Sequence, residues 1–145
     1  MSFLLLFHSM PRLLFVVILF INPLLSANAQ DEQLIRSIYF GGGSWSIDEY
    51  QLNELYEFVD SIPDLDQYEI IIHSHTDNIG GKEYNQWLSK MRSTSVYDRL
   101  IMHEVPSEMM HIKDLGQFNP SYNNNSFMGR LRNRRVDIIF QPIVF

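Results

Sequence analysis

The chain contains no cysteine among its 145 residues. No disulfide can form and no lipid-modified cysteine is available as an anchor, so the core must hold the fold without covalent help. Basic residues are also in the minority, with 11 Lys plus Arg against 17 Asp plus Glu. Because nucleic acids and acidic membrane surfaces are polyanions, this charge balance disfavours both as partners.

A long apolar run is missing as well. The uncharged stretch 13–29 is at the short edge of the roughly 17–25 residues that a membrane span needs. It ends in Ala-Asn-Ala at residues 27–29, the small-x-small pattern that signal peptidase cuts. We therefore interpret residues 1–29 as a cleaved signal peptide and expect residues 30–145 to form one exported domain. A retained membrane anchor is the alternative.

Hydrophobic periodicity and turn residues predict alternating strands and helices in the exported part. Strands are expected at 34–40, 68–74, 109–115 and 136–140, helices at 46–63 and 82–103, and a loop at 116–128. Ser46 and Glu49 match a capping box, which predicts that the first helix begins at Ser46. The β-branched run at 70–72 suggests a central strand covered on both faces. The predicted fold class is an α/β two-layer sandwich, β-α-β-α-β-loop-β, with a mixed four-stranded sheet and helices packed on it.

An acid, an amide and a guanidinium follow the second strand at suggestive spacings. Asp77 comes between a strand and a helix, at the usual ligand position of α/β sheets. Asn85 and Arg92 are seven residues apart on the predicted helix and so share a face. Helical side chains lean toward the N-terminus, which directs Arg92 back toward Asn85 and Asp77. A buried guanidinium is costly without a partner, so we expect Arg92 to have an anion.

Two partners for Arg92 remain open from the residues alone. In the first, Asp77 and Arg92 form an internal salt bridge, as most such pairs do. In the second, they are held apart, so that Arg92 binds a ligand carboxylate and Asp77 a ligand ammonium. The second arrangement would make a site for a small zwitterion.

Five sequence blocks in a fixed order carry a family resemblance. They are Phe40-x-x-Gly43-Ser44-x-x-Ile47, His75-Thr76-Asp77-Asn78-x-Gly80, Tyr84-Asn85-x-x-Leu88-Ser89-x-x-Arg92-x-x-x-Val96, Gly116-x-x-x-Pro120 and Asn133-Arg134-Arg135-Val136. Together they resemble the OmpA-like C-terminal domain of bacterial cell envelopes, over nearly all of the chain after residue 29.

This resemblance implies a non-enzymatic domain that binds peptidoglycan through the diaminopimelate of its stem peptides. It implies that Asp77 takes the amine and Arg92 the carboxylate of diaminopimelate, with Asn85 and Arg134 as supporting contacts. The expected location is the periplasm, peripheral to the outer membrane, with peptidoglycan and envelope proteins as partners. One alternative is a protein-interaction subunit that keeps the fold without wall binding. Another is an inner-membrane-anchored protein like the flagellar stator relatives.

The chain departs from the family pattern at several positions. Gly41 and Gly42 stand where an Asp or Asn is frequent, so one polar contribution to the pocket is missing. Ser74 replaces a glycine before the His-Thr-Asp triplet, and Ser93 replaces an alanine after Arg92. We expect these departures to affect the affinity for peptidoglycan, or which stem-peptide amino acid the domain prefers.

Other side chains are candidates for catalysis, metal binding or sugar binding. No serine lies in a nucleophile elbow, so we predict no enzyme and no cofactor. His73 and His75 have metal-ligand spacing without an evident third ligand, so we predict no metal site and expect His75 to support the Asp77 turn. Trp45 and Trp87 are candidate sugar platforms, although the core is the commoner place for such residues. Solvent exposure is expected for Arg130 and Arg132.

Overall fold

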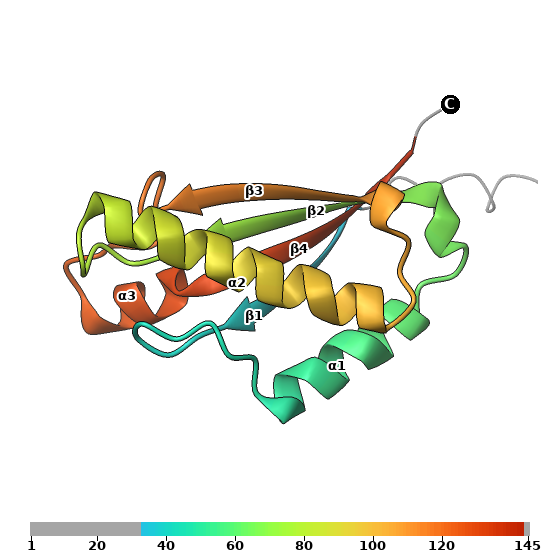
Figure 1. The fold of residues 1–145 in the computed structure, drawn as a ribbon, viewed down its shortest axis with the longest axis horizontal. Helices are drawn as coiled ribbons and strands as arrows, with labels where there is room; N and C mark the ends of the chain where they lie inside the picture. The colour runs from blue at the N-terminus through green and yellow to red at the C-terminus, as the bar shows by residue number, and fades with distance from the viewer. Residues whose placement is uncertain (1–32, 144–145) are drawn as a thin grey trace, which may run out of the picture. The chain divides into compact units, whose positions relative to one another are not determined.

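A computed structural model describes residues 33–143, and the expected signal peptide lies outside this range (Figure 1). Its elements are β1 (Leu34–Tyr39), α1 (Glu49–Asp60), the 3₁₀ turn η2 (Leu65–Gln67), β2 (Tyr68–His75), α2 (Lys82–Met102), the 3₁₀ turn η3 (Ser107–Met109), β3 (Met110–Gly116), α3 (Phe127–Asn133) and β4 (Arg135–Pro142). The predicted fold class is confirmed. The difference is α3, which begins inside the segment expected to be loop.

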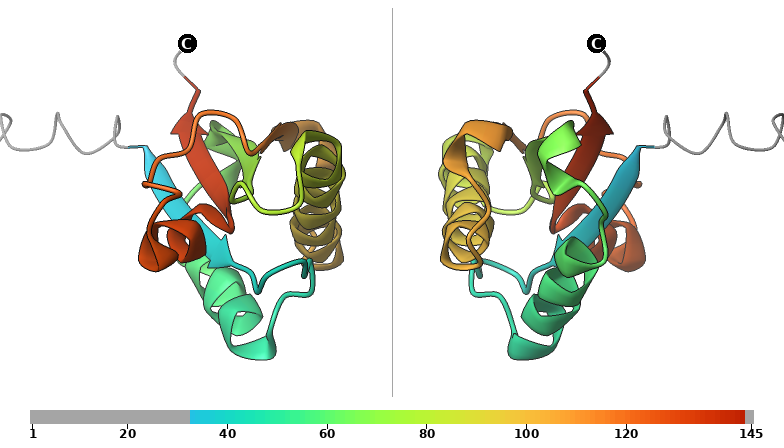
Figure 2. Two further views of the ribbon diagram at one scale, coloured as in Figure 1. Left: turned by 90° about the vertical axis from the view of Figure 1, so that its left-hand side faces the viewer. Right: turned by 90° about the vertical axis from the view of Figure 1, so that its right-hand side faces the viewer.

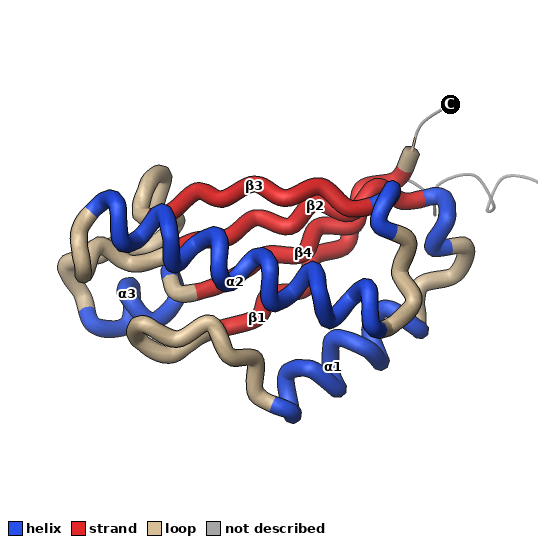
Figure 3. Tube along the Cα trace, viewed as in Figure 1, coloured by secondary structure: helices blue, strands red, loops and turns tan. Residues whose placement is uncertain are grey.

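The last strand lies inside the sheet rather than at its edge. The strand order is β1-β4-β2-β3, with β4 antiparallel to both of its neighbours and β2 parallel to β3. A parallel pair needs a long crossover, and α2 supplies it. Figures 1 and 2 show α1 and α2 on one face of the sheet. The loops after β1, β2 and β3 therefore meet α3 and the start of β4 at one end of the sheet (Figure 3).

The hydrophobic core fills the space between the sheet and its two long helices. Ile70 and Ile72 on β2 are fully buried there, but Ile71 between them is only half-buried. The expectation that β2 is covered on both faces is therefore wrong. Ile71 pairs with Ile139, and Ile139 with Ile35, in a row across the face away from the helices. Because this face is open, burial alternates along β2 even though its residues 70–72 are all apolar.

The N-cap of helix α1 lies two residues later than its sequence pattern predicts. Its N-cap is Asp48, whose carboxylate accepts the backbone N–H of Gln51 at 3.0 Å. The Gln51 side chain also bonds to the backbone of Tyr39 in both directions. The positive end of the helix dipole stabilises the negative charge of a carboxylate but not the neutral Ser46 hydroxyl, so Asp48 is the cap.

Within residues 33–143, none of the helices combines the length and apolar character that a membrane crossing requires.

A polar cluster on the open face centres on Asp137. Its carboxylate accepts hydrogen bonds from Ser37 at 2.6 Å and from Arg135 at 3.0 Å, and lies 3.4 Å from His75 Nε2. The imidazole thus faces β4, and the expected support of the Asp77 turn by this ring is wrong. Burial raises the pKa of Asp137, but the hydrogen bonds from His75, Ser37 and Arg135 outweigh it and lower that pKa to about 2.

Asp137→Asn should lower the free energy of unfolding at neutral pH by roughly 2 kcal/mol. A depressed carboxylate pKa stabilises the fold above the ordinary value of 3.8 and loses this contribution as the pH falls toward about 2. Urea unfolding between pH 7 and pH 2 should therefore show a shallower acid dependence for the variant. Asp66→Asn, an exposed position with the same change of charge, is the control. Equal stability of Asp137→Asn and the wild type would contradict this account.

Candidate ligand-binding site

The residues predicted to bind ligand come together at the end of the sheet where β1, β2 and β3 finish. Asp77 follows β2, Asn85 and Arg92 lie on α2, and Arg134 joins α3 to β4. The charges of Asp77 and Arg134 are both close enough to Arg92 to act on its pKa. The sheet order makes this possible, because β4 starts beside the end of β2.

Asp77 is held in a tight turn. Its carboxylate Oδ1 accepts the backbone N–H of Ile79 at 3.1 Å, and only 6% of the residue is exposed. Gly80 and Gly81 follow with φ of 103° and 83°, in the region that favours glycine. The backbone can therefore reverse into α2 while Asp77 stays at the strand end.

Asp77 forms its ion pair with Arg134. The guanidinium Nε donates to Asp77 Oδ2 at 2.7 Å, with little of either side chain exposed. The internal Asp77–Arg92 salt bridge, one of the two possibilities from sequence, is therefore not formed. The terminal nitrogens of Arg134 make no hydrogen bond with another described residue. They lie against Gly42, where a Cβ would come within 3.2 Å of Nη1, so a side chain there would crowd this cation.

Arg92 is fully buried and bound by backbone carbonyls. It donates from Nε to Ser44 (2.9 Å), from Nη1 to His75 (3.0 Å) and from Nη2 to Gly41 (3.0 Å). The expectation that its partner is an anion is wrong, because three carbonyl dipoles satisfy it instead. Arg92 thereby joins the loop after β1 to the end of β2. One N–H on each terminal nitrogen remains uncommitted.

The electrostatic state of Arg92 reflects this setting. Burial lowers its pKa to about 10, partly opposed by the negative charge of Asp77. Its guanidinium also lies 5.0 Å from the centre of the Phe40 ring, a cation–π contact. Arg92 stays charged at neutral pH and places a fixed positive charge beneath the site.

The amide of Asn85 has one unused polar atom. Its Nδ2 donates to Gln117 Oε1 at 2.8 Å, whereas Oδ1 is buried with no partner among the described residues. Buried acceptors are normally paired, so this oxygen is a candidate to meet a ligand N–H. Sequence reasoning missed Gln117, although it directly follows the Gly116 that opens the fourth sequence block.

Serine hydroxyls fasten α2 to the strands below it. Ser89 Oγ donates to the carbonyl of Ser74 and accepts the N–H of Gly116, each at 3.0 Å. Ser93, which departs from the family pattern, bonds to Asp114 at 2.5 Å. Ser74, the other serine that departs from the family pattern, is buried and its hydroxyl has no partner among the described residues.

Among residues 33–143, no group of three or more His, Asp or Glu side chains is placed to hold a metal ion.

The fold and these contacts define a small α/β sandwich domain with a charged site at one end of its mixed sheet. The chain belongs to the OmpA family, whose family model matches residues 39–134.

Comparisons with individual proteins agree with this assignment. The chain is 30% identical over 102 residues to the outer-membrane lipoprotein YfiB of Pseudomonas aeruginosa, covering 70% of this chain and 61% of that protein. It is 36% identical over 69 residues to the probable lipoprotein YiaD of Escherichia coli, covering 48% of this chain and 32% of YiaD. The chain thus spans about a third to three-fifths of these relatives.

Among solved structures, the peptidoglycan-associated lipoprotein of Burkholderia pseudomallei is similar in fold. The TM-score is 0.64 at 28% identity, with 73% of this chain and 90% of that chain covered.

Arg92→Lys should destabilise the domain by about 3 kcal/mol, because a compact ammonium cannot place its donors at the positions of the planar guanidinium, which meets two carbonyls of the loop after β1 and one at the end of β2. Thermal unfolding measures the loss. Amide hydrogen exchange should show faster opening of residues 41–44, which Arg92 holds in place. Arg99→Lys, an exposed position on the same helix, is the matched control. Unchanged exchange at residues 41–44 would show that Arg92 does not hold this loop.

Proposed function

We propose that this domain binds peptidoglycan non-covalently in the bacterial envelope, by recognising the diaminopimelate of its stem peptides. The observation that supports this most is the Asp77–Arg134 ion pair at the end of the sheet, close enough to the buried Arg92 for both charges to act on it, while Asn85 at the start of α2 keeps a buried acceptor without a partner among the described residues. The similarity to a peptidoglycan-associated lipoprotein at 28% identity adds support. The role proposed is binding without catalysis.

The chemistry of the free end of diaminopimelate suits these groups. One carbon there carries an ammonium and a carboxylate, a zwitterion. Asp77 takes the ammonium, since each of its oxygens has a lone pair beyond the contacts already made. Asn85 Oδ1 accepts a further ammonium hydrogen.

Arg92 and Arg134 together take the ligand carboxylate. Arg92 has no exposed surface, so the outward nitrogens of Arg134 meet the ligand first. Arg92 adds its positive charge from beneath, without direct contact, because it is fully buried and bound to carbonyls. In this proposal Arg134 has a larger part than the sequence alone suggests.

The proposed location is the periplasm, peripheral to the outer membrane. Two of its relatives, YfiB and YiaD, are described as an outer-membrane lipoprotein and a probable lipoprotein. The expected signal peptide at residues 1–29 is consistent with export. Envelope proteins are further proposed partners.

A protein-interaction subunit that keeps the fold without wall binding is the second candidate. It is favoured by the fact that both central charges already have partners in the free domain: Asp77 has Arg134, and Arg92 has three carbonyls. The apolar row of Ile35, Ile139 and Ile71 on the open sheet face offers a surface for such a partner.

In a sedimentation assay with purified diaminopimelate-type peptidoglycan, the wild-type domain should pellet. Asp77→Asn and Arg134→Gln should remain in the supernatant, with at least a tenfold loss of affinity, because each removes one charge that faces the ligand. Asp66→Asn and Arg132→Gln make the same changes at exposed positions and should pellet normally. Equal sedimentation of all five proteins would reject the assignment of the site.

Calorimetry with two soluble stem peptides should separate diaminopimelate recognition from general wall binding. Lysine lacks the terminal carboxylate of diaminopimelate, so the lysine-containing peptide should bind at least tenfold more weakly. Equal affinities would contradict recognition of that carboxylate. Absence of heat with both peptides, together with a stable crosslinked envelope complex, would favour the second candidate.

A further inference from the structure

Three aromatic side chains form an exposed cluster next to the proposed site. Trp45, Trp87 and Tyr84 are 39%, 46% and 42% exposed, so the expectation that the tryptophans belong to the core is wrong. Trp87 packs edge-on against Trp45 with ring centres 5.4 Å apart, and Tyr84 lies 5.7 Å from Trp87. We call this group the aromatic cluster. Large apolar rings that stay in solvent and hold one another in place are typical of binding surfaces.

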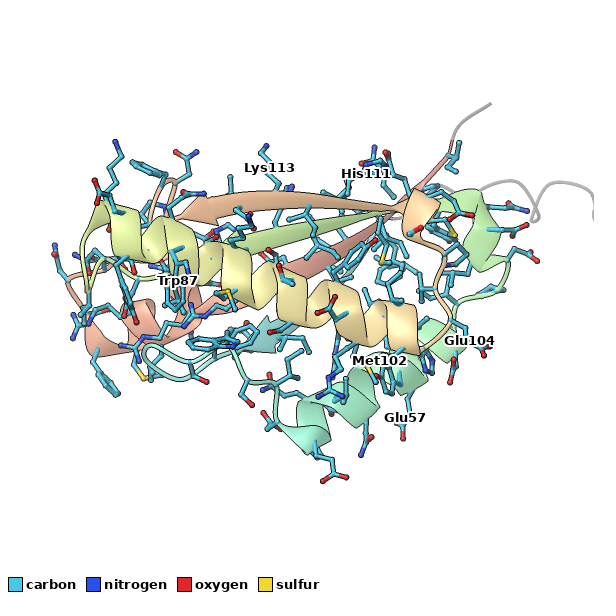
Figure 4. All side chains as sticks on the ribbon, in the orientation of Figure 1. Glu57, Trp87, Met102, Glu104, His111 and Lys113 are labelled. Carbon is cyan, nitrogen blue, oxygen red and sulfur yellow. The ribbon has the colours of Figure 1, made fainter. Side chains whose placement is uncertain are left out.

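A groove of about 430 Å³ continues from the aromatic cluster along α2. Residues 45–47 form one wall, and α2 contributes Ser95, Asp98, Arg99 and Met102. Figure 4 places Trp87 in the first half of α2 and Met102 at its other end, beside α1. The α2 residues that line the groove, 95–102, rise about 10 Å along the helix, and the aromatic cluster extends this surface toward the start of α2.

The groove combines the groups that sugar rings need. Trp45 offers an apolar face for the C–H groups of a pyranose. The side chains of Asp98 and Arg99 make no hydrogen bond or ion pair with another described residue, so they are available as acceptor and donor for hydroxyl and acetamido groups. A purely apolar partner would leave both charges unpaired.

The aromatic cluster borders the proposed diaminopimelate site through adjacent residues. Trp45 follows Ser44, whose carbonyl binds Arg92, and Tyr84 precedes Asn85. The third residue of a stem peptide is within roughly 10 Å of the sugar that carries the peptide. A peptide bound at Asp77 would therefore bring its amino-sugar strand to this cluster.

We propose that the aromatic cluster and its groove bind the glycan strand of peptidoglycan, a chain of N-acetylated amino sugars, while the Asp77 site holds the attached peptide. This inference rests on the proposed function and extends it to a second subsite of different chemistry. The two subsites can be tested separately, because a sugar oligomer without peptide probes the groove and a stem peptide without sugar probes the Asp77 site.

Intrinsic fluorescence gives a direct readout, since the chain has two tryptophans and both are in the aromatic cluster. Titration with a tetramer of N-acetylglucosamine, which carries no peptide, should produce a saturable change in the emission of the wild type. A glucose tetramer without acetamido groups should bind at least tenfold more weakly. Trp87→Ala, with Trp45 as the remaining reporter, and Asp98→Asn should each weaken binding of the acetylated tetramer at least tenfold.

Matched controls separate this inference from the proposed function. Asp77→Asn should bind the acetylated tetramer like the wild type, and Trp87→Ala should bind the diaminopimelate peptide like the wild type. Tyr50→Ala, which removes an aromatic side chain that is 71% exposed on α1, should change neither. Thermal unfolding checks that each variant is folded.

Either of two results with the sugar would overturn the glycan subsite. One is an unchanged emission of the wild type at millimolar tetramer; the other is equal tetramer binding by Trp87→Ala and the wild type. Loss of a crosslinked protein complex in Trp87→Ala, with no response to sugar, would assign the cluster to a protein partner and equally reject the proposal. Sugar binding without peptide binding would instead refute the diaminopimelate site and leave the groove standing.

Discussion

A single buried guanidinium organises the end of this domain where β1 and β2 finish. Arg92 reaches from α2 to the carbonyls of Ser44 and Gly41 in one loop and of His75 at the end of β2. Charged donors make stronger hydrogen bonds than neutral ones, so these three bonds offset part of the cost of burying the guanidinium, although desolvation still lowers the pKa of Arg92 to about 10. The position of the loop after β1, and of Trp45 within it, depends on these bonds.

The pairing of Asp77 with Arg134 adds the second constraint. It brings together residues that are 57 positions apart, because β4 enters the sheet between β1 and β2. The loop after β1 closes over this pair with Gly42, so the site has walls from three separate segments. A peptide-binding site at the strand ends and a sugar-binding groove along α2 would then share one border, at Ser44 and Trp45.

Much of the fold follows from local patterns. The four strands, both long helices and the Asp77 turn were predictable from periodicity and glycine placement, because each of these signals acts over a few residues. The cap of α1 and the missed helix α3 show the limit. Asp48 caps the helix in place of Ser46 because it bonds to Gln51, whose side chain in turn bonds to Tyr39 on β1. Helix α3 has only seven residues and depends on Asn133 bonds to the preceding loop.

The sequence by itself determined the fold class and the set of charged residues that gather at one end of the sheet, since composition, spacing and turn chemistry are local properties, and its five ordered blocks carried the family resemblance. Only the tertiary structure decided the partners: Arg134 for Asp77, backbone carbonyls for Arg92, and solvent for Trp45 and Trp87. The reason is physical. Which polar group satisfies a buried charge, and which aromatic face stays uncovered, depends on where separate segments meet in space, and spacing along the chain does not encode that.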